Sequence, residues 1–131
     1  MLKIKSFSDD RGILNVIECG VDIDFTIKRV YYIHNNSANL TRGFHAHKEL
    51  KQLMVCITGS VEVELNNGTD VEVHHLDNHD KGLLIDFPAW RVLRNFSEDA
   101  LVVVFASEVF IEDDYIKNYE EFLDYAKKIN E

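Results

Sequence analysis

The chain has 131 residues, and its 14 Lys and Arg against 23 Asp and Glu give a formal net charge of −9 at pH 7. This length suits one domain over residues 1–131 and is too short for two independent hydrophobic cores. The acidic surplus argues against nucleic acid and anionic membranes as partners, since both need a basic face. Two isolated cysteines without CxxC spacing, Cys19 and Cys56, are typical of a reduced interior, so we expect a cytoplasmic protein.

Most of the chain has the pattern of short strands separated by turns. In chain order, the first predicted strands are 12–18, 26–33, 43–47 and 52–57. Segment 60–65 then alternates polar and apolar residues, Asn66, Asn67 and Gly68 tolerate positive φ, and the alternation resumes at 71–73, which predicts a β-hairpin. Further strands are predicted at 82–85, 90–94 and 101–106. Short strands at regular spacing favour a sandwich or barrel.

The last stretch changes character and predicts a helix. Aromatic and apolar residues recur there at helical spacing, at Tyr115, Tyr119, Phe122, Leu123 and Ala126. Asp113 and Asp114 stand where an N-cap and a first-turn acid would stabilise the helix, and Lys127 and Lys128 suit its C-terminal end. We expect this helix to close the barrel or to cover its outside.

Segment 42–48, Arg-Gly-Phe-His-Ala-His-Lys, carries the most informative chemistry. Residues two apart on a strand share a face, so His45 and His47 point the same way. Two imidazoles on the inner wall of an apolar barrel indicate either a metal site or acid/base chemistry. The alternative is two exposed histidines on an edge strand, but the flanking Arg42 and Gln52 and the barrel pattern favour a functional site. Three other histidines, at positions 74, 75 and 79, lie in a loop or strand end and are expected to be solvated.

This spacing resembles the cupin signature of a glycine, HxH, an acidic ligand and a further glycine. The resemblance implies an all-β fold, a cupin-type β-barrel or jelly roll with a C-terminal α-helix. Gln52 stands where metal cupins carry glutamate. A second cupin motif runs glycine, proline, histidine, asparagine. Gly82, Pro88 and Asn95 fit this motif, but Arg91 replaces the histidine. A neutral amide is a poor metal ligand and a permanent cation repels a divalent ion. We therefore expect no metal and no other cofactor.

A narrower resemblance covers nearly the whole chain in order. Its segments are 28–33 (KRVYYI), 42–48 (RGFHAHK), Gln52, 90–91 (WR), 95–97 (NFS) and the tail 114–123. Together they look like the nucleotide-sugar 3,4-ketoisomerases of the WxcM-like cupin family. The resemblance implies an isomerase that moves the ketone of dTDP-4-keto-6-deoxyglucose from C4 to C3, before an aminotransferase makes a 3-amino-3,6-dideoxy sugar. It also implies a metal-independent homodimer, with the segment containing strand 12–18 crossing to the partner.

The implied reaction needs an acid/base group. It removes a proton from the carbon bearing the hydroxyl, forms an enediol or enediolate, and returns a proton to the former carbonyl carbon. A histidine with a pKa near neutrality suits both steps. We assign His47 as the base and His45 as its partner in proton transfer or enediolate stabilisation. Tyr32 is a further catalytic candidate because its hydroxyl is a possible donor to the enediolate.

The candidate substrate-binding residues are basic, polar or aromatic. Arg42 is a candidate clamp for the diphosphate as a guanidinium fork, with Arg29 or Arg91 assisting. The other candidates are Tyr31, Gln52 and Trp90, of which Gln52 is able to bond a sugar hydroxyl or a histidine. Trp90 is a candidate for stacking on the thymine or lining the sugar pocket, and core packing is an equal alternative.

Two alternatives remain open from the sequence. A sugar-nucleotide epimerase on a similar barrel would use the same proton abstraction next to a carbonyl and differ in where the proton returns. A non-catalytic cupin module would bind a sugar nucleotide without exchanging its protons with solvent. The stereochemistry at C4 of the product depends on the face that is reprotonated, which the sequence does not define.

Overall fold

The computed structural model describes residues 1–34 and 40–130. Over these residues the elements in chain order are β1 (Leu2–Lys3), β2 (Lys5–Asp9), β3 (Gly12–Val16), β4 (Arg29–Ile33), β5 (Arg42–His47), β6 (Gln52–Thr58), β7 (Val61–Asn66), β8 (Val71–Leu76), β9 (Lys81–Ile85), β10 (Trp90–Arg94), β11 (Leu101–Ala106), the 3₁₀ turn η1 (Glu112–Asp114), β12 (Tyr115–Ile116) and α1 (Tyr119–Ile129). None of the helices in this part of the chain is long and apolar enough to cross a membrane.

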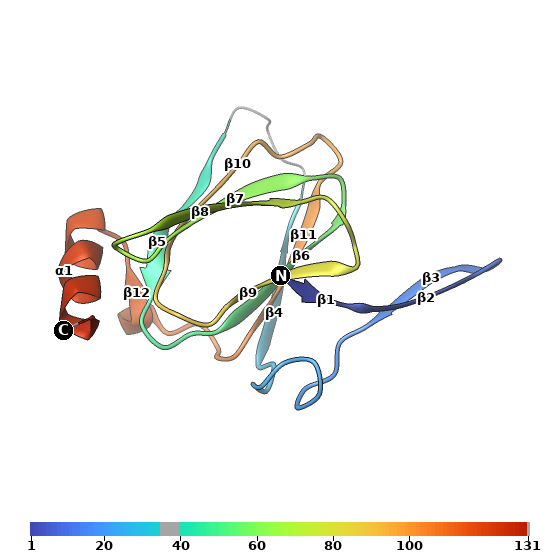
Figure 1. The fold of residues 1–131 in the computed structure, drawn as a ribbon, viewed down its shortest axis with the longest axis horizontal. Helices are drawn as coiled ribbons and strands as arrows, with labels where there is room; N and C mark the ends of the chain where they lie inside the picture. The colour runs from blue at the N-terminus through green and yellow to red at the C-terminus, as the bar shows by residue number, and fades with distance from the viewer. Residues whose placement is uncertain (35–39, 131) are drawn as a thin grey trace.

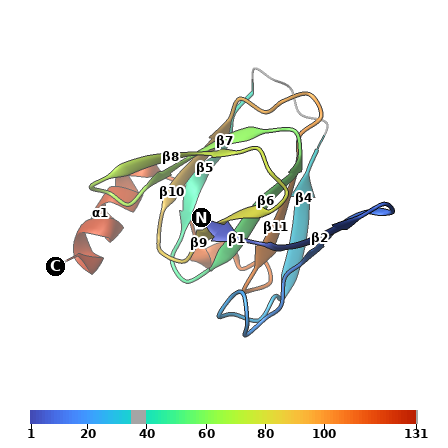
Figure 2. The same cartoon turned by 45° about the vertical axis from the view of Figure 1, so that its right-hand side comes forward.

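The strands form two five-stranded antiparallel sheets and one separate hairpin. One sheet has the order β1-β9-β6-β11-β4, the other has the order β12-β5-β10-β7-β8, and β2 pairs only with β3. The two sheets face each other and enclose a barrel (Figures 1 and 2). The predicted all-β barrel with a C-terminal helix is therefore confirmed, as is the hairpin formed by β7 and β8.

The barrel interior is an apolar core with one polar end. Buried side chains from both sheets and from the segments that flank β10 and β11 form the main cluster: Met54, Cys56, Val61, Val63, Leu65, Leu76, Leu83, Ile85, Ala89, Leu93, Phe96, Ala100, Val102 and Val104. Burial of this apolar surface is the main driving force for closing the sheets on each other. Three of the few buried polar side chains, His47, Gln52 and Arg91, share the interior with these residues. Buried polar groups of this kind are costly unless they are paired, so they mark a site rather than a core.

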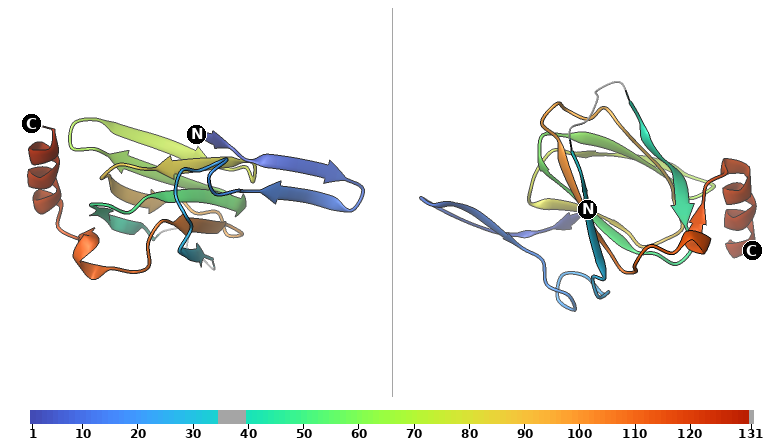
Figure 3. Two further views of the ribbon diagram at one scale, coloured as in Figure 1. Left: turned by 90° about the horizontal axis from the view of Figure 1, so that it is seen from below. Right: turned by 180° about the vertical axis from the view of Figure 1, so that it is seen from behind.

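Helix α1 covers the outer face of the sheet that contains β5 and β10. Its buried residues Phe122 and Ala126 pack on Ala46, Trp90 and Val92, which face away from the barrel interior. The helix lies on one side of the barrel and the β2–β3 hairpin projects from the opposite side (Figure 3). The prediction that the helix covers the outside of the barrel is confirmed.

The predicted start of the helix is wrong. The N-cap is Asn118, whose side-chain oxygen accepts a hydrogen bond from the backbone N–H of Glu121 at 3.0 Å. Asp113 and Asp114 belong instead to η1, and Tyr115 belongs to the short strand β12. Pairing of β12 with β5 competes with helix formation here, and the backbone bonds of the sheet replace those of a first helical turn.

Candidate active site

The two histidines of β5 lie together on the inner face of the barrel. Their ring centroids are 4.9 Å apart with the rings at 85°, so one ring packs edge-on against the other. His47 is 1% exposed, whereas His45 is half-buried. The Nδ1 of His45 lies 3.1 Å from the carbonyl oxygen of Gly43, which accepts its proton and leaves Nε2 as the unprotonated nitrogen. The period-two argument from the sequence therefore places both rings correctly.

A β-bulge at the start of β5 aims the histidines inward. Gly43 and Phe44 both have positive φ, 98° and 56°, and the register with β10 shifts between Arg91 and Val92. A Cβ on Gly43 would lie 2.7 Å from the carbonyl oxygen of Arg91, so only glycine lets the two strands approach this closely. Beyond the bulge, His45 stands directly opposite Arg91.

Arg91, Gln52 and Tyr31 form a hydrogen-bonded chain across three strands. Arg91 is 2% exposed; its Nη1 donates to Oε1 of Gln52, and its Nη2 lies 3.4 Å from the carbonyl oxygen of Ala89. The Nε2 of Gln52 donates in turn to the hydroxyl oxygen of Tyr31 at 2.9 Å. An amide provides one acceptor and one donor group, which is what a guanidinium on one side and a phenol on the other require. Gln52 therefore bonds both neighbours at once.

Burial and nearby cations keep both histidines neutral near pH 7. Burial, followed by the charge of Arg91, lowers the pKa of His45 to about 4. The same two causes lower the pKa of His47 to about 2, with smaller contributions from His45 and Arg29. Arg91 stays charged, although burial lowers its pKa to about 10. The near-neutral pKa expected from the sequence is therefore not found, because both rings are buried next to Arg91. The site presents two unprotonated imidazoles beside a fixed positive charge.

Two further residues border the histidines. Tyr115, opposite His47 in the β12–β5 pairing, places its ring centroid 4.2 Å from that of His47 and 5.3 Å from that of His45. The guanidinium carbon of Arg29 lies 5.5 Å from the centroid of the Tyr31 ring. The Nε and Nη2 of Arg29 are buried with no hydrogen-bond partner among the described residues. Sequence reasoning did not assign Tyr115 to the site, because it read this residue as part of a helix.

The structure brings some predicted residues together and separates others. Arg29, Tyr31, His45, His47, Gln52 and Arg91 gather at the inner face. Tyr32 points to the opposite face of β4 and is 64% exposed, so within one chain it lies away from the histidines. Trp90 packs beneath α1 with Tyr119 and Phe122, which is its core-packing alternative. Arg42 is exposed at the first residue of β5, at the other end of the strand from His47.

His74, His75 and His79 do not join this site. His74 and His75 lie in β8, where His74 pairs with Glu72 and His75 faces Glu62. The ring of His79 bonds the side chain of Asn15. Across residues 1–34 and 40–130, no three His, Cys, Asp or Glu side chains are grouped as a possible metal site. At the histidine site itself, the positions of the two missing cupin ligands hold an amide and a guanidinium that bond to each other.

A family model and a curated relative both match nearly the whole chain. The family model described as "FdtA: WxcM-like, C-terminal" matches residues 1–127. The chain is 41% identical over 130 residues to the TDP-4-oxo-6-deoxy-alpha-D-glucose-3,4-oxoisomerase of Aneurinibacillus thermoaerophilus, with 99% of this chain and 94% of the relative covered.

Two solved structures are similar over nearly their whole length. The sugar 3,4-ketoisomerase QdtA from Thermoanaerobacterium thermosaccharolyticum, in complex with TDP, has a TM-score of 0.94 and 41% identity, covering 98% of this chain and 93% of that one. The TDP-quinovose 3,4-ketoisomerase WlaRB from Campylobacter jejuni has a TM-score of 0.90 and 41% identity, covering 94% of this chain and 95% of that one.

Proposed function

This chain belongs to the WxcM-like, C-terminal family, and from that premise we propose that it is a 3,4-ketoisomerase of dTDP-4-keto-6-deoxyglucose. The names of its relatives, at 41% identity over nearly the full chain, support this activity and a TDP-linked sugar as substrate. The observation that carries the proposal is the pair of neutral histidines on one inner face of the barrel, beside the buried charge of Arg91.

The proposed reaction moves one hydrogen between neighbouring carbons. His47 accepts the proton of C3 through a ring nitrogen, and the C–H electron pair forms a C3=C4 double bond as the charge moves to the oxygen at C4. The imidazolium of His47 then returns a proton to C4, and the proton of the C3 hydroxyl passes to the oxygen at C4, which leaves a ketone at C3 and a hydroxyl at C4. His45, as the second neutral imidazole, relays protons between the two oxygens. A positioned acid/base group of this kind typically contributes a factor of about 10² to 10⁴ in rate.

The negative charge of the enediolate needs a fixed donor or cation in a water-poor site. Arg91 supplies the cation, and Gln52 holds it in place. Tyr31 already accepts a hydrogen bond from Gln52, so its own proton is free for a substrate oxygen. Burial is the largest effect on Tyr31 and raises the pKa of its hydroxyl, which keeps it a donor.

Substrate binding draws on the same interior and on its rim. Arg29 has two buried guanidinium nitrogens without a partner among the described residues, which suits a phosphate oxygen. We keep Arg42 as a second diphosphate ligand on the strength of the family resemblance. A 3-keto product is the substrate type from which an aminotransferase makes a 3-amino-3,6-dideoxy sugar, and we propose that this is its fate.

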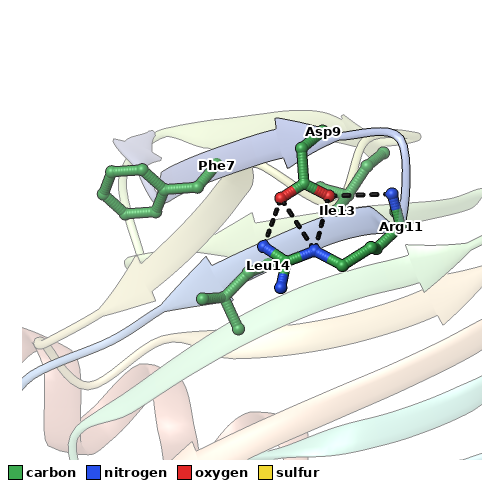
Figure 4. A pocket seen from close by; sticks show the side chains of 6 residues that line it. Phe7, Asp9, Arg11, Ile13 and Leu14 are labelled. Atoms are coloured by element: carbon green, nitrogen blue, oxygen red, sulfur yellow. Dashed lines mark hydrogen bonds and ion pairs between the residues drawn. The ribbon is translucent and has the colours of Figure 1, made fainter.

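We further propose that the protein is a homodimer in the cytoplasm. The β2–β3 hairpin projects from the barrel and presents Phe7 and Leu14, which stand opposite each other and are 59% and 62% exposed (Figure 4). A lone two-stranded hairpin is only marginally stable in water, and β4 is an edge strand with exposed Val30. Packing of the hairpin on a second copy would bury these groups. Two free cysteines, at positions 19 and 56, fit a reducing compartment.

Two substitutions test the proposed roles. His47→Asn keeps a similar size but cannot take a proton near pH 7, so turnover should fall by about 10² to 10⁴ while substrate still binds. Arg42→Ala should weaken binding more than the chemical step, because a diphosphate clamp acts on ground and transition states alike. Wild-type turnover in His47→Asn, in folded protein, would refute the assignment of the base.

A further inference from the structure

His47 is surrounded by positive charge. Burial, followed by the charge of Arg91 from β10 and, to a smaller extent, by His45 and by the charge of Arg29 from β4, disfavours its protonated form. Tyr115 from β12 packs edge-on against its ring and adds no charge that would offset these effects. Both ring nitrogens are buried without a hydrogen bond among the described residues. A base in this setting needs something to orient its ring and to stabilise the imidazolium that it becomes.

One carboxylate faces this ring. The Oδ2 of Asp114 lies 3.6 Å from the Nδ1 of His47, and the Asp114 side chain is only 14% exposed. Asp114 is the last residue of η1 and immediately precedes Tyr115, which is paired with His47 in the β12–β5 ladder. Sheet register therefore brings the carboxylate to the histidine.

The carboxylate is also held in a fixed direction. Its Oδ1 accepts a hydrogen bond from the backbone N–H of Glu49 at 2.8 Å, and its Oδ2 accepts one from Leu50 at 3.3 Å. The carbonyl oxygen of Asp114 accepts a third, from the N–H of Lys48 at 3.1 Å. These three amides belong to the residues directly after His47, so Asp114 and His47 are tied to the same turn.

We propose that Asp114 is a positioning residue for His47: its carboxylate selects the tautomer with the proton on Nδ1 and leaves Nε2 free to take the substrate proton. A carboxylate only accepts hydrogen bonds, so the nitrogen facing it carries a proton. The separation of 3.6 Å exceeds a hydrogen-bond length by only about 0.5 Å, so a small shift of the His47 ring toward the fixed carboxylate forms the bond. When His47 gains the proton of C3, the same carboxylate balances the new charge against Arg91 and Arg29. The catalytic part of this inference rests on the proposed function.

The competing explanation is that Asp114 only caps the turn after His47. Asp114→Asn separates the two roles, because an amide oxygen still accepts from one turn amide while its NH₂ group donates to Nδ1. That donor reverses the tautomer of His47 and places the proton on Nε2. Asp113→Asn is the matched control, since Asp113 is an exposed carboxylate in the same 3₁₀ turn.

The first measurement is independent of catalysis. Full-length protein labelled with ¹⁵N-histidine, studied at pH 7.5 by two-bond ¹H–¹⁵N correlation, reports which ring nitrogen of each neutral histidine carries the proton. His47→Asn assigns the signal by its disappearance. We expect His47 to be protonated on Nδ1 in the wild type and in Asp113→Asn, and on Nε2 in Asp114→Asn. A wild-type His47 protonated on Nε2 overturns the proposal without any variant at position 114.

The second measurement is the pH profile of kcat and KM. Asp114→Asn should lower kcat by at least about 100-fold with little change in KM, as loss of the correct tautomer does in other His–Asp pairs. Asp113→Asn should match the wild type. If the tautomer reverses in Asp114→Asn but kcat and its pH profile are unchanged, Asp114 has no role in the reaction. If the wild type shows the Nδ1 tautomer but no isomerase activity, the proposed function fails and the orienting contact stands.

Discussion

Replacing Gln52 isolates the hydrogen bonds that hold Arg91 beside the histidines. Leucine has nearly the same volume as glutamine, but it offers no acceptor to Arg91 and no donor to Tyr31. Gln52 is 1% exposed, so water cannot replace the lost partners. Leaving a buried charged donor and a buried hydroxyl unpaired costs about 1.5–3 and 1–2 kcal/mol, so Gln52→Leu should lose about 2.5–5 kcal/mol of unfolding free energy.

Gln52→Glu is the matched control. A glutamate has the same shape, accepts from Arg91 as a carboxylate, and accepts from Tyr31 once the phenol reverses its bond. We expect its stability to stay within about 1.5 kcal/mol of the wild type at pH 7. Urea unfolding followed by Trp90 fluorescence, at one protein concentration and with similar m-values, measures all three proteins. A loss below about 1 kcal/mol in Gln52→Leu would refute the hydrogen-bonded chain as the reason that Arg91 is tolerated in the barrel.

Three other predictions concern metal, pH and assembly. Activity should survive exhaustive chelation, because Gln52 and Arg91 occupy the places of metal ligands; loss that one divalent ion restores would contradict this. Because the pKa values of His45 and His47 lie below that of an unfolded histidine, the unfolded chain binds more protons below pH 6.5. Stability should therefore be fully present above pH 6.5 and fall by about 1.4 kcal/mol per pH unit for each histidine as the solution becomes more acidic. Urea titrations of the wild type and His45→Gln at a series of pH values check this. If the free energy of unfolding has the same slope against pH in both proteins, His45 makes no contribution. Light scattering should show a dimer in the wild type and weaker dimerisation in Leu14→Asp. A wild-type monomer at micromolar concentration would exclude the proposed dimer.

The strands and side-chain directions that follow from a period-two pattern were predictable from the sequence. Those that depend on which strand pairs with which were not. Strands β10 and β11 begin and end as the alternation predicts, and His45 and His47 share a face because of it. Strand β2 was missed because it is largely exposed on both faces and leaves no period-two pattern. Among residues 1–34 and 40–130 it pairs with β3 alone, so neither face of the hairpin has to be consistently apolar.

The neighbours Tyr31 and Tyr32 illustrate the limit at the site. Either tyrosine suits a strand, and a one-residue change of register exchanges which of them faces the histidines. Pairing with β11 decides it, because Tyr31 stands opposite Val104, whose side chain lies in the core. Tyr115 was misplaced for a similar reason, since two acidic residues before it imitate a helix cap while β5 pairs with it as a strand. Such choices depend on residues far away in the chain.

The most direct test of the proposed activity is incubation with dTDP-4-keto-6-deoxyglucose in D₂O, followed by ¹H NMR. We expect the 3-keto isomer to appear with deuterium at C4, recovered substrate to exchange its hydrogen at C3, and His47→Asn to slow both processes together. A product that keeps its ketone at C4 but has an inverted neighbouring centre would indicate an epimerase. Binding of the substrate with neither isomer nor exchange would contradict catalysis and leave the chain a binding module.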